Sequence, residues 1–346
     1  MYFGFDSEQL AFRDAVRDLL DKDCPPEAVR AAWQAPPGRL DRTVWDHLAA
    51  MGVLGVLVPE ADAGLGLDER SLVLILEEAG RAALPHPVAE TAAVAARLPA
   101  AAARASAGAL VASDLGGPNV VCAADADALL LVATDASVSR SVARSRDGSG
   151  HRTGAWTALY LAEPGAVRLT PVDTLDGARR AARVGWSPSD ATLVTDDPDE
   201  IDRAFDRGAW ATAAQLVGLG QRMLDITVTY VDQREQFGQR VGAFQAVKHH
   251  LADALKELAF ARPAVHRAAH SLAVDAPTRA RDVSMAKAMA AEAAWFVGRQ
   301  ALQCHGAIGY TVEGDLHLYL KRTWALAKSW GDAAWHRDRV GTALGI

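Results

Sequence analysis

The chain has 346 residues, half of them hydrophobic and 23% charged. This is enough apolar material for a large core in two or three domains, and it excludes an intrinsically disordered chain. The formal net charge of −7 also excludes a general nucleic-acid binder, because binding a phosphate backbone requires a basic face.

The first part of the chain predicts an N-terminal helical domain over residues 1–107. Apolar residues recur at roughly helical spacing from Phe5 to Leu20, and Asp6 or Ser7 can cap this helix. A later helix begins after a glycine-punctuated loop, with Asp68 as its cap.

A change of period marks the next part, residues 108–198. The Ala-rich segment 92–107 predicts a plain helix that ends the first domain. Short apolar or alternating runs then follow, separated by Gly, Pro, Asp and Ser, as is typical of a small antiparallel β-domain. The polar, basic stretch 137–154 predicts a solvated loop. The expected strands cover residues 109–113, 119–124, 128–134, 156–162, 167–172, 180–186 and 192–196.

The last part, residues 199–346, returns to helical periodicity. Long helices are expected over 209–231, from Val241 and over 279–303, and a final helix from about Ala333 would complete a four-helix bundle. Two apolar stripes are expected to be buried: Val241, Phe244, Val247, Leu251, Leu255 and Leu258 on one helix, and Met285, Met289 and Phe296 on the next. The fold class predicted is therefore α+β and mainly α.

Two motifs in the helical part have cofactor-binding chemistry. Arg234 to Gly238, REQFG, is a tight turn whose arginine could hold a phosphate pair bidentately. Near the C-terminus, Gly306 and Gly309 break a helix end and would offer free N–H groups close to a ligand.

The order of domains and these motifs, with the PEADAGLG loop at 59–66, resembles the acyl-CoA dehydrogenase family over essentially the whole chain. The resemblance implies FAD, an acyl-CoA substrate, and α,β-desaturation in which a carboxylate takes a proton and the flavin accepts a hydride.

The resemblance also implies roles for individual residues at the FAD of a neighbouring subunit. Arg234 would hold the pyrophosphate, Gln236 would add a polar contact and Phe237 would pack along the cofactor. Gln303 and the backbone of Gly306 would reach the same neighbour's FAD. The alternatives are a surface ion pair for Arg234 and an ordinary helix-end polar residue for Gln303. A further difference is Ala307, which replaces a glycine common in the family.

The position of the family's catalytic glutamate falls on Trp330, which cannot abstract a proton. The position used by a minority of members lies near Gly208, which is not acidic either. Asp206 and Asp332 are the nearest carboxylates, but aspartate at such positions is typical of helix starts. No catalytic residue is therefore assigned.

The β-domain also departs from the family pattern. Where members carry a stretch like TEPxAGSD, residues 109–117 run almost directly into a later strand, so the half of a flavin site within the subunit is missing. What remains would serve a partner's FAD in trans.

This asymmetry resembles the smaller subunit of actinobacterial α2β2 acyl-CoA dehydrogenases, and it implies a homologous partner and a steroid side-chain or other bulky acyl-CoA. The alternatives are a self-sufficient enzyme with a relocated base, at Asp332 or Asp206, and a non-catalytic acyl-CoA-binding or scaffold protein.

The remaining features predict a cytoplasmic protein without metal. Cys24, Cys122 and Cys304 are widely separated, which favours reduced thiols. The N-terminus lacks a signal-peptide pattern, and no uncharged apolar run reaches about 18 residues. The pair His249 and His250 would point to different helix faces, so no metal site is expected.

Overall fold

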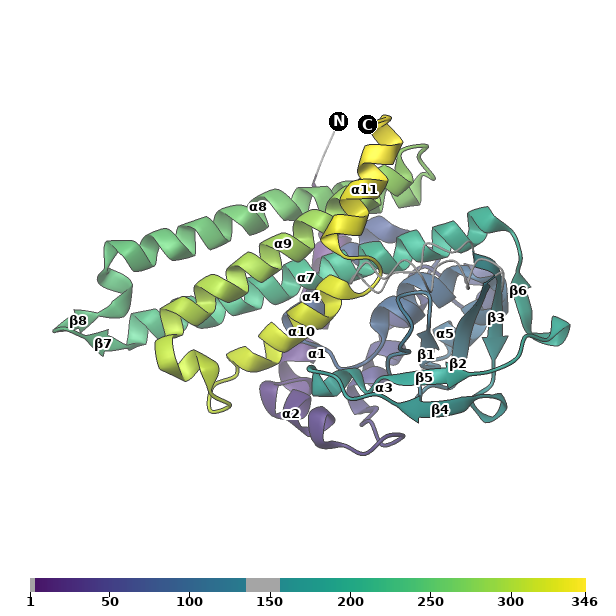
Figure 1. The fold of residues 1–346 in the computed structure, drawn as a ribbon, viewed down its shortest axis with the longest axis horizontal. Helices are drawn as coiled ribbons and strands as arrows, with labels where there is room; N and C mark the ends of the chain where they lie inside the picture. Colours follow the sequence, from purple (N-terminus) through teal and green to yellow (C-terminus); the bar gives the residue numbers. More distant parts are fainter. Residues whose placement is uncertain (1–3, 135–155) are drawn as a thin grey trace.

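Helices at both ends of the chain flank a small group of strands in the computed structural model, which describes residues 4–134 and 156–346 (Figure 1). The loop expected at 137–154 lies outside these described residues. The N-terminal helices are α1 (Ser7–Asp23), α2 (Pro26–Gln34), α3 (Thr43–Ala50), α4 (Glu69–Arg81) and α5 (Pro99–Ser106).

Two predicted helix caps are confirmed. Asp6 Oδ1 accepts a hydrogen bond from Gln9 N at 2.8 Å, and Gln9 Oε1 accepts one from Asp6 N at 3.1 Å, which forms a capping box. Asp68 accepts a hydrogen bond from the backbone of Arg70 at the start of α4. Local sequence chemistry therefore sets where these helices begin.

The plain helix expected over 92–107 is wrong in its first half. Residues Ala89–Val94 form a π-helical turn and Ala95–Arg97 a 3₁₀ turn, and α5 begins only at Pro99. The residue before a proline is driven out of the helical region, and Leu98 is accordingly extended, with φ −104° and ψ 115°.

Strands β1 to β6 form two sheets beside the helices. The first has the order β1-β2-β3-β6 and the second pairs β4 with β5. Their bounds are β1 (Val111–Ser113), β2 (Ala128–Thr134), β3 (Trp156–Ala162), β4 (Arg168–Pro171), β5 (Ala182–Gly185) and β6 (Leu193–Thr195).

The prediction of the β-domain needs two corrections. β1 pairs with β2 in parallel, whereas the other paired strands are antiparallel, and the intervening segment is long enough for such a crossover. The strand expected at 119–124 is a turn region, in which Val120 makes an isolated bridge to Ala182. Cys122 has a φ of +54°, a left-handed conformation that a strand does not accommodate.

The C-terminal part is a bundle of long helices that projects away from the strands (Figure 1). The final helix α11 packs on α9, as expected, and a further helix, α10, which was not predicted, packs on both α7 and α9. The glycines after residue 305 had indicated only a helix end, although the helical pattern resumes beyond them. The bounds are α7 (Pro198–Gln233), α8 (Gln245–Ala273), α9 (Arg279–His305), α10 (Leu316–Lys328) and α11 (Ala333–Leu344).

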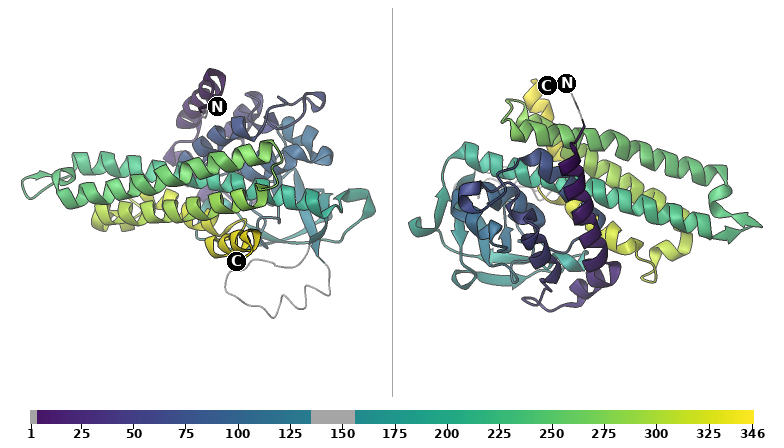
Figure 2. Two further views of the ribbon diagram at one scale, coloured as in Figure 1. Left: turned by 90° about the horizontal axis from the view of Figure 1, so that it is seen from above. Right: turned by 180° about the vertical axis from the view of Figure 1, so that it is seen from behind.

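Glycines join the N-terminal helices to the bundle. A Cβ on Gly80 of α4 would lie 2.1 Å from the carbonyl oxygen of Gln215, and one on Gly218 of α7 would lie 1.9 Å from that of Glu77. The backbones of α4 and α7 therefore touch at points that only glycine allows. On the other side, α1 lies across the bundle, where Phe5 meets His266 edge-on with ring centroids 5.0 Å apart (Figure 2).

The predicted buried stripes are only partly buried. On α8, Leu258 is buried, but Leu255 is 51% exposed, and Val247 and Leu251 are of intermediate exposure, as are Val241 and Phe244, which precede the helix. On α9, Met285 is 42% exposed. The apolar period identified the helices correctly, yet part of each stripe faces outward in the single chain. None of the helices in the described ranges combines the length and low polarity that a membrane span requires.

Candidate functional site

A short hairpin at the free end of the bundle carries the first predicted cofactor motif. It joins α7 to α8 through β7 (Glu235–Gln236) and β8 (Gln239–Arg240) and lies at the opposite end of the molecule from the sheets (Figure 1). Phe237 and Gly238 form its two-residue loop, with φ of +53° and +79°. Positive φ at both loop positions matches the twist of a tight hairpin, and it presents the Phe237 side chain to solvent, 93% exposed.

The second predicted motif lies where α9 ends. Gln303 is exposed on the last turn, and Gly306 terminates the helix with a φ of +64°. A Cβ on Gly306 would meet nothing within 4 Å, so its backbone borders open space.

The structure brings these two motifs to the same end of the bundle. Tyr230, one turn before Arg234, stacks on His305 with ring centroids 4.4 Å apart. The Tyr230 hydroxyl also donates to the His305 carbonyl oxygen at 3.5 Å. The ends of α7 and α9 are thus held together, with Arg234 and Gly306 each next to this contact.

The charged groups of the hairpin differ in their partners. Arg240 forms an ion pair with Asp232 at 2.9 Å. Arg234 is exposed, and within residues 4–134 and 156–346 its guanidinium has no ion pair, so the predicted alternative of a pair with Glu235 is not formed. Gln236 Nε2 donates to the Glu235 carbonyl oxygen at 2.6 Å, which leaves its amide oxygen facing outward. The hairpin therefore offers one guanidinium that can pair with an anion.

Exposed apolar side chains surround this end of the bundle. A large exposed apolar surface is typical of a protein-protein contact. The apolar side chains more than one third exposed here are Val228, Phe237, Ile308, Tyr310 and Val312 near the hairpin and the end of α9, with Leu255 and Phe260 further along α8.

The position expected for the catalytic base lies in the core, near the sheets. Trp330 is 1% exposed and follows α10 in a left-handed turn, with a φ of +57°. Its ring packs directly against Gly208 of α7, the second position considered for a base in the sequence. The tryptophan ring therefore occupies the space next to both positions.

The two nearby aspartates have structural partners. Asp206 is fully buried between Arg279 Nε at 3.0 Å and Arg339 Nη1 at 2.5 Å. Asp332 caps α11 by accepting a hydrogen bond from Trp335 N at 3.0 Å, and it pairs with Lys328 at 3.1 Å. The oxygens of each carboxylate are occupied by cations or backbone donors, so neither is directed at a substrate as a proton-abstracting base would be.

A pocket lies between the β-domain and the bundle, beside Trp330. Its volume is about 160 Å³, below the roughly 300–1,000 Å³ typical of sites that enclose a small molecule. Four aromatic residues, Trp156, Trp186, Phe205 and Trp335, line it together with small, aliphatic and polar groups from the β-domain and the turn after α10. The described residues therefore do not enclose a flavin ring at this position, whereas the hairpin end presents a guanidinium, an amide and an aromatic ring to solvent.

Two buried ionisable residues near this pocket were missed in the sequence. Glu90 is the single acidic residue in an apolar, Ala-rich run, and burial raises its pKa. Lys287 of α9 is fully buried, and loss of solvation lowers its pKa to about 7. A lone charge within an apolar run was the available signal for Glu90, but helical spacing alone does not indicate which polar residue is buried.

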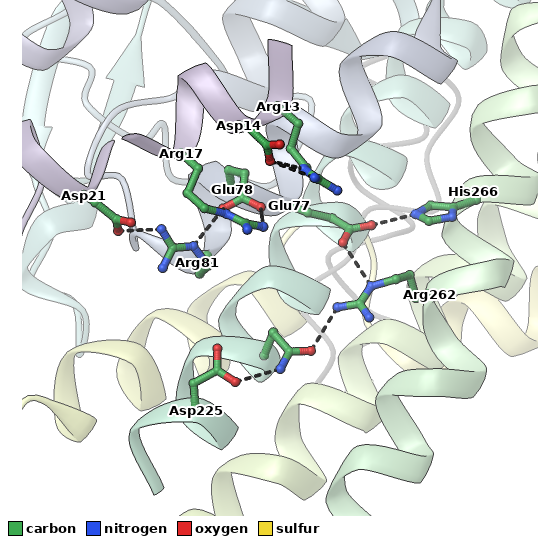
Figure 3. A network of polar contacts seen from close by, with 11 residues as sticks. Arg13, Asp14, Arg17, Asp21, Glu77, Glu78, Arg81, Asp225, Arg262 and His266 are labelled. Carbon is green, nitrogen blue, oxygen red and sulfur yellow. Dashed lines mark hydrogen bonds and ion pairs between the residues drawn. The ribbon is translucent and has the colours of Figure 1, made fainter. Parts of the chain in front are cut away.

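A polar network between α1, α4, α7 and α8 has a structural role (Figure 3). Glu78 accepts hydrogen bonds from Arg17 and Arg81, while Glu77 pairs with Arg262 at 3.0 Å and with His266 at 2.7 Å. Each carboxylate is matched by two cationic or hydrogen-bonding partners, so the network ties the N-terminal helices to the bundle.

No cluster of three or more metal-ligating side chains occurs in the described parts of the chain. The three cysteines are free, with Cys24 and Cys122 buried and Cys304 partly exposed.

Family models and a curated relative both match this chain to the acyl-CoA dehydrogenases. The N-terminal and C-terminal domain models of the acyl-CoA dehydrogenases match residues 6–109 and 200–345. The acyl-CoA dehydrogenase IpdE2 of Mycobacterium tuberculosis is 31% identical over 323 residues, which cover 91% of this chain and 90% of that protein.

Solved structures show the same fold. A chain of the ChsE4-ChsE5 complex of Mycobacterium tuberculosis superposes with a TM-score of 0.86 at 23% identity, and the match covers 100% of this chain and 99% of that one. A variant of the Tcur3481-Tcur3483 steroid ACAD gives a TM-score of 0.83 at 24% identity, with 98% of each chain covered.

Proposed function

Because the chain belongs to the acyl-CoA dehydrogenase family, whose members are FAD-binding oxidoreductases, we propose that it is one subunit of a heterotetrameric acyl-CoA dehydrogenase. In this assembly it completes the FAD site of a homologous partner subunit. The partner supplies the carboxylate base and the segment that binds the flavin ring. The reaction is α,β-desaturation of an acyl-CoA thioester, in which FAD accepts the hydride.

The observation that carries this proposal is the burial of Trp330 in the place of a base. An indole cannot accept a proton from carbon, and at 1% exposure its ring excludes a substrate from the same space. A chain of this kind contributes to catalysis through another subunit.

The chemistry of the hairpin end supports the role in trans. Arg234 can bind a pyrophosphate with two parallel N–H donors, and Gln236 can add a polar contact. Phe237 offers an exposed aromatic face, and Gln303 with the Gly306 backbone lies at the adjoining helix end. These groups point away from the chain's own core, so they can serve only a ligand that another molecule brings to them.

A bulky acyl group, such as a steroid side chain, is the substrate class we favour. One similar structure is a steroid ACAD and another is a complex of two different chains. A site shared between unlike subunits can leave one wall of the acyl pocket free to widen. The three unpaired cysteines suit the reducing cytoplasm, where we place the assembly.

The test is co-expression with a homologous partner that carries the glutamate, followed by measurement of the flavin-to-protein ratio. Arg234→Ala should weaken flavin retention by the assembly roughly ten- to hundredfold, because it removes charge-assisted hydrogen bonds. Arg240→Ala is the matched control. It removes another exposed arginine from the same hairpin, but one that already pairs with Asp232, and it should leave the flavin unchanged.

The outcomes separate the three readings of this chain. Unchanged flavin in the Arg234→Ala assembly would contradict the proposed role in trans. Full activity of the isolated chain would favour a self-sufficient enzyme, and absence of flavin absorbance from every assembly would favour a scaffold protein.

A further inference from the structure

Trp330 stands between two cavities. The outer one is the pocket between the β-domain and the bundle, and both Gly116 and Phe205 line it. The inner one has a volume of about 30 Å³, room for about one water, and it is lined by Glu90 and by Trp330 itself. The indole ring contacts Gly116 and lies 5.9 Å from the ring of Phe205, so it separates the outer cavity from the inner one.

The surroundings of the ring admit no other side chain. A Cβ on Gly208 would lie 2.3 Å from the six-membered ring of Trp330, and a Cβ on Gly116 would lie 2.7 Å from its indole nitrogen. The Trp330 backbone N–H donates to the Gly116 carbonyl oxygen at 2.9 Å, and the indole N–H donates to the Glu90 carboxylate. The ring is thus bound on both sides, to the β-domain and to the inner cavity.

The turn that carries the ring is also fixed. His336 Nε2 donates to the Trp330 carbonyl oxygen at 2.7 Å, and Lys287 Nζ donates to the Gly331 carbonyl oxygen at 2.9 Å. Both donors are fully buried. Two side chains of the bundle therefore hold the left-handed pair formed by Trp330 and Gly331, and the ring is a fixed wall rather than a mobile gate.

We propose that Trp330 divides what would otherwise be one continuous pocket leading from the β-domain to Glu90, and that this wall excludes acyl groups from this chain. In this respect the inference rests on the proposed function, because it decides which subunit of the assembly admits substrate. The Trp330 ring blocks the pocket in addition to the lack of a base. Introducing a carboxylate alone would therefore not create a working acyl-CoA site in this chain.

The test is chemical labelling of Glu90 in the isolated chain by a water-soluble carbodiimide with glycine ethyl ester, read by peptide mass spectrometry. In the wild type, Glu90 should remain unlabelled. In Trp330→Ala, the two cavities should join, and labelling of Glu90 should rise at least about tenfold as reagent enters.

Two controls make the result specific. Glu69 is fully buried and ion-paired with Arg207, so it reports global unfolding and should stay unlabelled throughout. Trp335→Ala widens the outer cavity and leaves Trp330 in place, so Glu90 should remain protected in that variant.

A second variant, Trp330→Leu, keeps an apolar side chain in the core and is labelled in parallel. The inference is overturned if Glu90 stays unlabelled in the variants that keep Glu69 protected, or if Trp335→Ala exposes Glu90 equally well. The measurement involves neither flavin nor partner, so its failure is distinct from failure of the Arg234 experiment.

Discussion

Lys287 Nζ lies 2.9 Å from the carbonyl oxygen of Gly331, with no part of the lysine exposed to solvent. A second hydrogen bond reaches the carbonyl oxygen of Ala327 at 3.3 Å, near the end of α10. Carbonyl groups at a helix end are favourable partners for a cation, yet burial lowers the pKa of Lys287 to about 7. This lysine joins α9 to the turn that carries Trp330.

We expect Lys287 to make stability increase with pH. The unfolded chain keeps the lysine proton up to about pH 10.5, whereas the folded chain loses it near pH 7, so raising the pH across this window favours folding. The free energy of unfolding of the wild type, measured relative to Lys287→Met, should rise by up to about 1.4 kcal/mol per pH unit between pH 7 and 9. Urea unfolding at several pH values measures it, and parallel curves for the two proteins would contradict it.

Gly208→Ala should destabilise the chain by about 3 kcal/mol, because the new methyl group overlaps the ring of Trp330. The same substitution made in a Trp330→Ala background should cost much less, since the ring is gone. Additive effects in this double-mutant cycle would show that the two residues are not coupled.

Acid should destabilise the chain through His86. This histidine is stacked on Trp45, donates from Nε2 to the Asp41 carbonyl oxygen at 2.9 Å, and has no partner at Nδ1 among the described residues. Burial lowers its pKa from 6.5 to about 4.

The unfolded chain therefore takes up a proton at His86 near pH 6.5 that the folded chain takes up only near pH 4, and stability is lost as the pH falls between these values. The loss should be roughly 3 kcal/mol. His86→Gln does not titrate here, so thermal unfolding from pH 7 to 4 should show a smaller acid effect in that variant. An equal loss of stability in both proteins would rule out His86 as the cause.

Phe237→Gly should have opposite effects on the chain and on the assembly. The isolated chain should be stabilised by about 1 kcal/mol, since glycine accepts the left-handed backbone and the lost ring is 93% exposed. Flavin retention by the assembly should fall, because the aromatic contact is missing. Chemical unfolding of the chain and flavin release from the complex measure the two effects separately, and a destabilised isolated chain would contradict the first.

Sequence patterns predicted where helices and strands occur better than they predicted how strands pair and which side chains are buried. Asp6 and Asp68 were found as caps because capping depends on residues within one turn. The parallel pairing of β1 with β2 was missed, since it depends on contacts distant in sequence. Leu255 had the spacing of a core residue but is half exposed, because apolar periodicity does not distinguish a core from an exposed apolar face.

The candidate site was predictable to a similar extent. Counting from Gly309 places Trp330 where the family resemblance predicts a glutamate, which stays a prediction, but the packing of Trp330 on Gly208 could not be predicted from the sequence. Glu90 was missed because its burial and its contact with Trp330 depend on the π-helical turn that carries it, which the sequence did not predict.

Because α7 is long, the packing at its Trp330 end affects the position of the hairpin at its other end. The helix runs from beneath Trp330 to the hairpin, and from Gly208 to Gln233 it spans roughly 38 Å at about 1.5 Å per residue. A tilt of about 5° at the Gly208 end would displace the hairpin by about 3 Å. This displacement is larger than the range of donor–acceptor distances over which a hydrogen bond forms. The tight packing around Trp330 therefore fixes one end of α7, and its rigidity determines how accurately the hairpin at the other end is positioned.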